Sequence, residues 1–407
     1  MANSRTRIIS QSKALFVSPT GLPTATDSGY VPDQLHRIDT FSFDIDIAGA
    51  RTDIREFGQL ARIASVTMSD INPSISFGYY LLDGENEARL GFNDDGITGG
   101  AGLPHSQFVS GIVSEDPLKK EKNLYMLTSK EGDDAFNSGE ILKAANFKNT
   151  DNIGFGNVTM NSYTASFAVG DIPRVDIEAE CSNVMFNTGT LTGVNPSINK
   201  LGARQAGRYI LATSGNAAFS GPVGPSTGDM DFPVLKPDDI TITFSNPTFE
   251  MGGTNFSDMH IQSATVEIPL TRTNIEALGS ARPVAKPLEF PIDVTMSFSS
   301  LLKNFDDGAL DLILTGTAGD ETTDVTLQIN DESGNLQNKY ILKGAQLDSQ
   351  SFSQGLDDNE TVDLTFSAQI GAPNPPTQGI FYTGKFDGVV DATGANMKSV
   401  VPMAGIS

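Results

Sequence analysis

Histidine and cysteine, the residues that most often carry chemistry, are scarce in this chain and stand in no motif. The three histidines, His36, His105 and His260, form no HExxH pattern, no His/Cys cluster and no zinc-like spacing. The single cysteine, Cys181, alternates inward in an expected strand and has no nearby basic partner to activate a thiolate. We therefore predict packed or solvated histidines, a small core cysteine and no nucleophile.

Glycine-rich and acidic segments also lack the patterns of known sites. The run Gly96-Ile97-Thr98-Gly99-Gly100 has no Gly-Lys-Ser/Thr ending, so it indicates a loop rather than a phosphate cradle. The acidic pairs lack the one-three-five spacing and closing Glu of a calcium loop, and they indicate turns: Asp94-Asp95, Asp306-Asp307, Asp331-Glu332 and Asp357-Asp358. A pair of carboxylates that catalyses glycoside hydrolysis remains an alternative, although the chain has no Trp to form a platform for a sugar ring. We expect that the protein is not an enzyme and that it binds no metal and no cofactor.

Composition narrows the class of protein. At 407 residues the chain can form two domains of ordinary size, each with its own core. Its 50 acidic and 27 basic residues give a net charge of −23, which disfavours nonspecific binding to DNA or to an anionic membrane. No stretch approaches the ~18 apolar residues of a membrane span, and the N-terminus lacks the apolar core of a signal peptide. One cysteine excludes an intrachain disulfide framework, so we expect a soluble protein that folds in a reducing cytoplasm.

The chain contains an internal repeat. RTDIREFGQLAR from Arg51 is answered by RTNIEALGSAR from Arg272, at an offset of 272 − 51 = 221, which also pairs Ile54 with Ile275 and Gly58 with Gly279. Upstream, residues 37 to 47 answer 260 to 270 at an offset of 223; downstream, 160 to 180 answer 347 to 367 at 187. The first copy is longer by 223 − 187 = 36 residues, most of them between residues 93 and 124.

Periodicity indicates that both copies are mainly β. Apolar and polar residues alternate in residues 41 to 47, 175 to 181 and 264 to 268, as in strands with one face on a core and one on water. Helical signal is thin: short segments at 53 to 60 and 86 to 90, and one amphipathic stretch at 139 to 147. The fold class we predict is two tandem homologous β-sandwich or barrel domains, each with about one short helix.

The expected boundaries follow from the repeat and from composition. Domain 1 covers residues 37 to 186, with an insertion at about 93 to 124, and domain 2 covers 239 to 371. Between them lies a Gly/Ser/Pro-rich linker at 187 to 238, and the ends form an N-terminal arm, 1 to 36, and a C-terminal arm, 372 to 407. A plain tether and an arm that packs on a neighbouring subunit are both open for these segments.

The repeat resembles a known family. An alternating strand, a loop with R-x-D/N-I-x-x-x-G, β-branched strands and a closing strand pair with a G-D-I-P-like turn are similar to phage tail tube proteins, also called major tail proteins. The first copy is the closer match, through RTDIREFGQLARIASV and SFGYYLLDGENEARLGF. The repeat signature comprises six structural residues: Arg51, Ile54, Gly58, Arg272, Ile275 and Gly279.

What the resemblance implies is a ring. Tail tube proteins form hexameric rings whose strands build a continuous inner β-barrel, and stacked rings make the conduit through which DNA enters the host. Two such domains per chain would let three chains form a pseudo-hexameric trimer in the virion tail, assembled in the host cytoplasm. Other partners would be the tape measure, tail terminator and baseplate or tip proteins, and a sheath where the tail has one. DNA would pass transiently without specific binding, and no membrane would be involved.

An acidic channel fits this expectation. Carboxylates on the polar strand faces would repel DNA phosphates, and seven acids are candidates to face the lumen: Asp44, Asp46, Asp176, Glu178, Glu180, Glu267 and Asp363. The insertion and both arms are candidates for contacts between stacked rings. A different class stays open as the alternative: a virion adhesin, baseplate or decoration protein built from two β-sandwiches.

Overall fold

A computed structural model of the chain shows a mainly β protein. The residues that it describes are 13–20, 33–47, 51–67, 72–81, 84–92, 106–113, 120–128, 151–188, 196–198, 240–245, 260–278, 283, 285–301, 322–330, 336–353, 361–370 and 378–384. Several sequence predictions fall outside them: His105, Gly279, the glycine run at 96–100, the helix at 139–147 and the four acidic pairs.

Before residue 190 the described residues form thirteen elements: β1 (Lys13–Pro19), β2 (Asp33–Gln34), β3 (Ile38–Asp44), β4 (Arg51–Ile54), β5 (Ala64–Thr67), β6 (Ser74–Tyr80), α1 (Glu85–Leu90), β7 (Ser106–Gln107), α2 (Ser110–Val113), β8 (Lys122–Thr128), β9 (Asp151–Ala168), β10 (Arg174–Glu180) and β11 (Asn183–Thr188). Seven strands follow: β12 (Ile240–Phe244), β13 (His260–Pro269), β14 (Ile292–Leu301), β15 (Thr323–Asn330), β16 (Leu336–Ser353), β17 (Thr361–Ile370) and β18 (Gly379–Gly384). Both described helices thus lie in the first half, whereas the sequence predicted about one short helix in each half.

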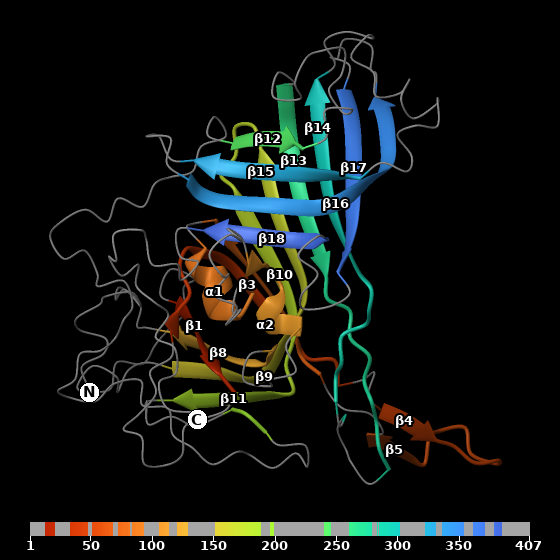
Figure 1. The fold of residues 1–407 in the computed structure, drawn as a ribbon. Helices are drawn as coiled ribbons and strands as arrows, with labels where there is room; N and C mark the ends of the chain where they lie inside the picture. Colours follow the sequence, from red (N-terminus) through yellow and green to blue (C-terminus); the bar gives the residue numbers. More distant parts are fainter. Residues whose placement is uncertain are drawn as a thin grey trace, which may run out of the picture.

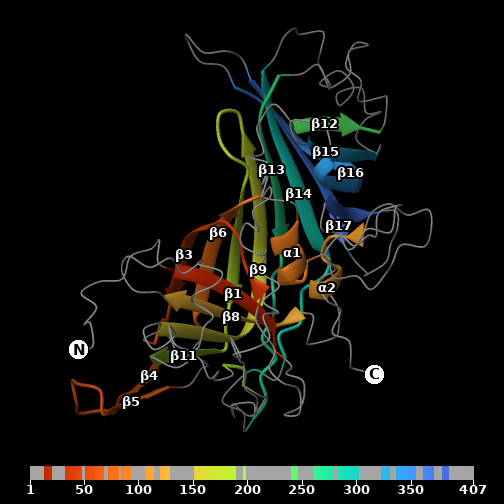
Figure 2. The ribbon, with the colours of Figure 1, turned by 90° about the vertical axis from the view of Figure 1, so that its left-hand side faces the viewer.

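One antiparallel sheet runs through both halves of the chain. Its strand order is β3-β6-β10-β9-β13-β14-β17-β16, and we refer to these eight strands as the long sheet. The 18-residue strands β9 and β16 each leave it at their N-terminal part and enter a flanking sheet, β1-β8-β9-β11 or β12-β15-β16-β18. Figure 1 shows β15, β16 and β18 crossing in front of β13, β14 and β17, and Figure 2 shows the same layers turned by 90°.

The two halves share strand order and register. Phe41 is opposite Phe77 on β3 and β6, and Ala264 is opposite Phe298 on β13 and β14; the offsets are 264 − 41 = 223 and 298 − 77 = 221. Both β9 and β16 carry an extra residue against the neighbouring strand, Asn161 and Asp348, at an offset of 348 − 161 = 187. The offsets read from the sequence therefore describe how the strands pair.

The halves are joined by backbone pairing of β9 with β13. Thr164 lies opposite Glu267 in this ladder, and its ends are fixed by Val169 N–H donating to the Gln262 carbonyl at 2.9 Å and Leu270 N–H donating to the Asn161 carbonyl at 2.8 Å. Inward-facing apolar residues of both halves then form one buried cluster that includes Phe77, Val175, Val266 and Phe366. The long sheet therefore has a core shared by both halves on one face.

Part of the insertion at 93–124 is a wedge between the halves. Phe108, fully buried, packs its ring 4.9 Å from Tyr163 of the first half and 4.8 Å from Tyr382 of the second. Strand β7 pairs with β18, and the Tyr163 and Tyr340 hydroxyls are 2.8 Å apart. The described part of the insertion thus lies in the interior, which differs from the expectation that it binds a stacked ring.

The expected arms also contain sheet strands. The N-terminal segment provides β1, which pairs with β8 along its whole length, and the C-terminal segment provides β18, which pairs with β16. Their apolar residues, such as Leu15 and Ile380, are buried. The sequence hid these strands because each carries an apolar run without alternation and lies in a Gly/Pro-rich neighbourhood. The segment at 53–60, expected as a helical turn, instead lies in a hairpin made of β4 and β5.

Helix α1 carries a buried polar cluster. Asn86 holds the His36 backbone by two hydrogen bonds, accepting from its N–H at 2.8 Å and donating to its carbonyl at 2.9 Å. Arg89 donates to His36 Nε2 at 2.9 Å, so the imidazole is neutral with its proton on Nδ1. Burial, with the nearby charges of Arg89 and Arg37, lowers the pKa of His36 from 6.5 to about 3.

The first prediction concerns this histidine. Above pH 6.5 the imidazole is neutral in both the folded and the unfolded chain. Below pH 6.5 the unfolded chain binds a proton that the folded chain does not, so the protein becomes less stable as the pH is lowered. We expect the free energy of unfolding to drop by about 2 kcal/mol between pH 7.5 and 5 from this group. Urea unfolding across this pH range measures the drop, with His36→Gln as the control that cannot titrate. Equal pH slopes for the two proteins would contradict the prediction.

Candidate functional site

The outward face of the long sheet is polar across both halves of the chain. Strict alternation places apolar side chains on the core and polar ones outside, as in β17, where Asp363, Thr365 and Ser367 alternate with buried Val362 and Leu364. Neighbouring strands continue this pattern in register. One row across six strands reads Gly78, Asp176, Thr164, Glu267, Thr295 and Ser367. We call this surface the polar face.

The predicted acids come together on this face. Asp44, Asp176, Glu178, Glu180, Glu267 and Asp363 all point outward from strands of the long sheet, and Asp46 follows β3 and is exposed. Asp176 of the first half and Glu267 of the second lie on either side of Thr164. The structure therefore brings acids from both halves onto one surface, which the sequence could group only by their alternation.

Two further acids on the polar face were not singled out in the sequence. Asp293 is exposed on β14, where it alternates with buried Ile292 and Val294, so the period-two pattern was sufficient to find it. Asp39 lies at a register shift in β3, where the pairing of Ile38 and Thr40 skips one residue. No alternation rule places a bulge residue, so Asp39 required the structure.

Serine and threonine fill the space between the acids. Ser42 and Ser76 lie opposite each other with their hydroxyl oxygens 2.7 Å apart, and Ser297 and Thr365 are 3.3 Å apart. Such hydroxyls can bond to one another or to water and carry no charge. The polar face is therefore a hydrated surface whose fixed charges are nearly all negative.

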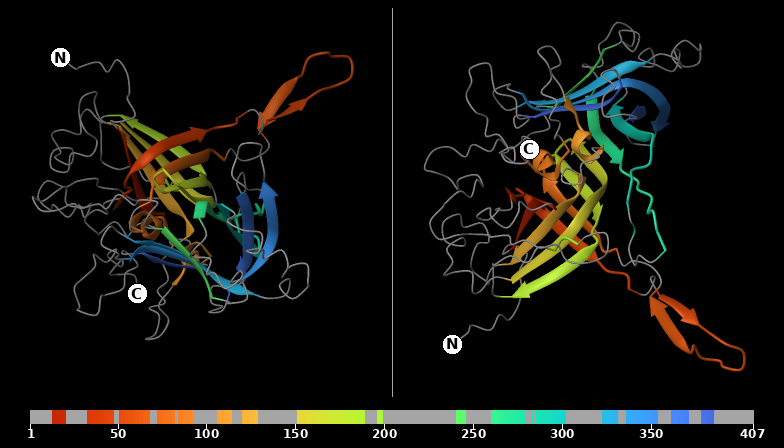
Figure 3. Two further views of the ribbon diagram at one scale, coloured as in Figure 1. Left: turned by 90° about the horizontal axis from the view of Figure 1, so that it is seen from above. Right: turned by 60° about the horizontal axis from the view of Figure 1, so that its bottom comes forward.

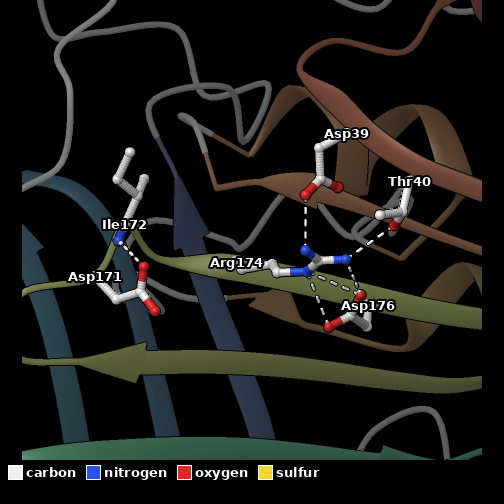
Figure 4. Close-up of polar contacts among 6 residues, drawn as sticks. All are labelled: Asp39, Thr40, Asp171, Ile172, Arg174 and Asp176. Carbon is white, nitrogen blue, oxygen red and sulfur yellow. Dashed lines mark hydrogen bonds and ion pairs between the residues drawn. The ribbon is translucent and has the colours of Figure 1, made fainter. Parts of the chain in front are cut away.

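Arg174 is the one Lys or Arg among the described strand residues that point outward from the long sheet. Its guanidinium donates to Asp39 at 2.7 Å, to Thr40 at 2.8 Å and to Asp176 at 2.9 Å (Figure 4). Gly78 makes this possible, because a Cβ there would lie 2.4 Å from Arg174 Nη2. The hydrogen bond to Asp176 raises the pKa of Arg174, and its charge is compensated by two carboxylates.

The five described residues of the repeat signature lie away from the polar face, on two hairpins. Arg51, Ile54 and Gly58 belong to the β4–β5 hairpin, which projects from the body (Figure 3) and whose described side chains are all exposed. The second hairpin has matching bridges, Arg272 with Leu288 and Ile275 with Ala285. The described signature residues of the two copies thus occupy matching positions of two similar hairpins.

The two signature arginines differ in their surroundings. Arg272 lies at the base of its hairpin, where it donates to the Lys286 carbonyl at 3.0 Å and, more weakly, to the Met160 carbonyl of β9 at 3.4 Å. Burial lowers its pKa to about 10. Lys286 beside it donates to Asn72 at 3.1 Å, so the second hairpin is anchored on the first half. Arg51 occupies the equivalent position and is exposed.

The described cysteine and histidines lie apart from one another and form no catalytic arrangement. Cys181 is fully buried and burial raises the pKa of its thiol to about 12, which confirms the predicted core position. His36 is buried beside Arg89, and His260 is exposed at the start of β13. The described residues include no group of three or more His, Cys, Asp or Glu side chains suited to a metal ion. Among them, too, no helix has the length and apolar character to cross a membrane.

Comparison with known proteins adds no relative: no protein-family model and no curated protein matches this sequence.

The second prediction compares the two arginines. Arg272→Met removes charged donors from two backbone carbonyls in a buried setting, and we expect it to lower the free energy of unfolding by roughly 1 to 2 kcal/mol. Arg51→Met, the matched change on the exposed hairpin, should alter the stability of the isolated chain by less than about 0.5 kcal/mol. Urea denaturation of dilute protein measures both. Equal losses would show that the anchoring contacts of Arg272 contribute no stability.

Proposed function

We propose that this chain is the structural subunit of a phage tail tube, and that stacked rings of it form a conduit for double-stranded DNA. The observation that carries the proposal is the polar face. A single sheet runs unbroken through both repeats, is buried on one side and presents acids and hydroxyls on the other. A surface of this kind suits the wall of a water-filled channel. The family resemblance and the internal repeat support the same proposal.

The number of strands fits a bore of the required size. Each half contributes four strands to the long sheet, β3-β6-β10-β9 and β13-β14-β17-β16. Three chains would then supply 24 strands, and at ~4.8 Å per strand the circumference is about 115 Å before tilt, which gives a diameter of about 37 to 48 Å. After side chains are added, such a channel admits a duplex roughly 20 Å wide.

The charge of the polar face gives the conduit a mechanism. DNA crosses fastest where the wall neither pairs with its phosphates nor traps them. Asp176, Glu178 and Glu267 repel phosphates, and Arg174 is neutralised by Asp39 and Asp176. The net charge of −23 extends this repulsion beyond the individual residues.

The hairpins suit contacts between stacked rings. Phe57 and Leu278, which correspond at an offset of 278 − 57 = 221, are fully exposed at the hairpin tips, with relative exposures of 107% and 108%. Exposed Val169 and Ile172 lie in the β9–β10 turn, at the opposite end of the long sheet from the hairpins. Apolar residues at both ends favour head-to-tail stacking, which produces an open filament. The hairpins join the insertion and the arms as candidates for these contacts; the described parts of the insertion and the arms include β1, β2, β7, α2 and β18.

The third prediction tests the proposed function directly. Negative-stain electron microscopy of purified protein, over a range of concentration and salt, should show stacked rings about 100 Å wide with a central hole. Class averages should contain three repeating units, because each chain supplies two of the six domains. Compact particles with no hole under every condition would overturn the proposal and favour the adhesin, baseplate or decoration alternative.

The fourth prediction concerns the channel wall. Glu178→Lys places an uncompensated cation on the polar face, and we expect assembled tubes of this variant to retain short duplex DNA in a salt-sensitive way, whereas unsubstituted tubes release it. Glu276→Lys, on the exposed second hairpin, makes the same change in charge away from the sheet. Cosedimentation of labelled duplex with tubes measures retention. Equal retention by the two variants would place Glu178 outside the lumen.

A further inference from the structure

The long sheet ends in two open edges within the described part of the chain. Strand β3 pairs with β6 on one side, and residues 346–353 of β16 pair with β17 on one side; no described strand adds to the other side of either. Open edges present rows of unpaired backbone N–H and C=O groups, which invite pairing with another chain. Both edges also contribute outward residues to the polar face.

These two edges correspond to the two strands that already pair inside the chain. Strand β3 is the counterpart of β13, and residues 346–353 of β16 are the counterpart of 159–166 in β9. We propose that β3 of one copy adds to β16 of a second copy in the register of the β13–β9 joint. The inference rests on the proposed ring and specifies the surfaces, the order and the contacts by which it closes.

The internal joint fixes the register residue by residue. Glu267 opposite Thr164 becomes Asp44 opposite Ser351, since 267 − 223 = 44 and 164 + 187 = 351. Pro269 opposite Ser162 becomes Asp46 opposite Ser349 by the same arithmetic. The hydrogen bond from Leu270 N–H to the bulge carbonyl of Asn161 becomes one from Ile47 to Asp348.

The distribution of charge favours pairing of β3 with β16 over pairing of two β3 strands. Strand β3 and the residues after it carry Asp39, Asp44 and Asp46, so antiparallel pairing of two β3 strands would set carboxylates close together across the joint. Residues 346–353 of β16 offer Ser349 and Ser351 on the same face, which can donate to carboxylates. The joint is therefore head-to-tail, and a head-to-tail joint closes into a ring when the rotation between copies completes a full turn, as it would in the proposed trimer.

Two side chains at these edges lack the contacts that their counterparts make. Arg51 is exposed, whereas Arg272 donates to the Met160 carbonyl; the counterpart of Met160 is Leu347, since 160 + 187 = 347. Gln350 corresponds to Tyr163, and both of its amide atoms are buried without a hydrogen-bond partner in the described part of the chain. In the proposed register a neighbouring copy would supply the first of these contacts. Arg51 of one copy would donate to the Leu347 carbonyl of the other and hold the base of the β4–β5 hairpin there.

Engineered cysteines test the register. In the internal joint, hydrogen-bonded pairs include Leu270 with Asn161, so Glu267 and Thr164 form a non-hydrogen-bonded pair, whose side chains are closest. Asp44→Cys with Ser351→Cys should therefore cross-link copies under mild oxidation. The control, Ser42→Cys with Ser349→Cys, uses the same strands and face but is four residues out of register. Cys181 is fully buried, and its protection from a thiol reagent reports that each variant is folded.

The expected result is dimers and trimers on a non-reducing gel for the in-register pair, and at least tenfold less cross-linked product for the control. Rings in the microscope with cross-links at equal yield in both pairs, or in neither, would overturn the register while leaving the tube proposal standing. Folded protein with no rings and no cross-links would overturn both.

Arg51→Met supplies an independent readout. We expect it to shift the concentration for half-maximal assembly upward by about tenfold, while the unfolding curve of the dilute chain stays unchanged. An assembly curve that matches the unsubstituted protein would remove Arg51 from the joint.

Discussion

Backbone pairing between β9 and β13 is the interaction on which the rest of this structure depends. It turns two repeated halves into one sheet, with a single core on one side and a single polar surface on the other. Register in such a joint is strongly constrained, because a slip of one residue would move Val266 and Ile268 from the core to water and Glu267 into the core. The bulge at Asn161, bonded to Leu270, further fixes the position at which the ladder ends.

The same constraint explains why the halves have diverged in some places and agree in others. Most inward positions remain apolar in both, as with Ile177 and Leu364, because each faces the shared core, and Gln350 in place of Tyr163 is an exception at the open edge. Outward positions need only be polar, so Thr365 and Ser367 stand where Glu178 and Glu180 stand in the first half. In the proposed ring the charge of the wall would consequently alternate around the bore. Such a wall repels DNA as long as it adds no uncompensated cation, and Arg174, the basic exception, is paired.

The sequence predicted the mainly β class, several central strands and the outward position of the acids, because each depends on a period of two that is visible locally. Features that depend on contacts between distant residues could not be predicted. Strands β1 and β18 carry continuous apolar runs instead of alternation, and their burial comes from β8 and β16. Phe108 packs between Tyr163 and Tyr382, which both lie more than fifty residues later in the chain. Gly78 matters through Arg174, almost a hundred residues later. The arginines at 51 and 272 lie in similar sequence contexts, yet one is exposed and the other is partly buried.

The internal joint and the proposed joint between copies share a backbone but differ in what covers them. Inside the chain, Phe108 wedges between Tyr163 and Tyr382, and β7 adds backbone pairing to β18. The repeat offsets place no counterpart of this insertion in the second half, so the joint between copies would lack the wedge and present Gln350 in place of Tyr163. Less apolar area would then be buried there, and the joint would be the weaker of the two. A subunit built this way forms its internal joint as it folds and its external joints only at the concentrations reached during assembly. That order suits a protein whose open edges would otherwise pair before its core is complete.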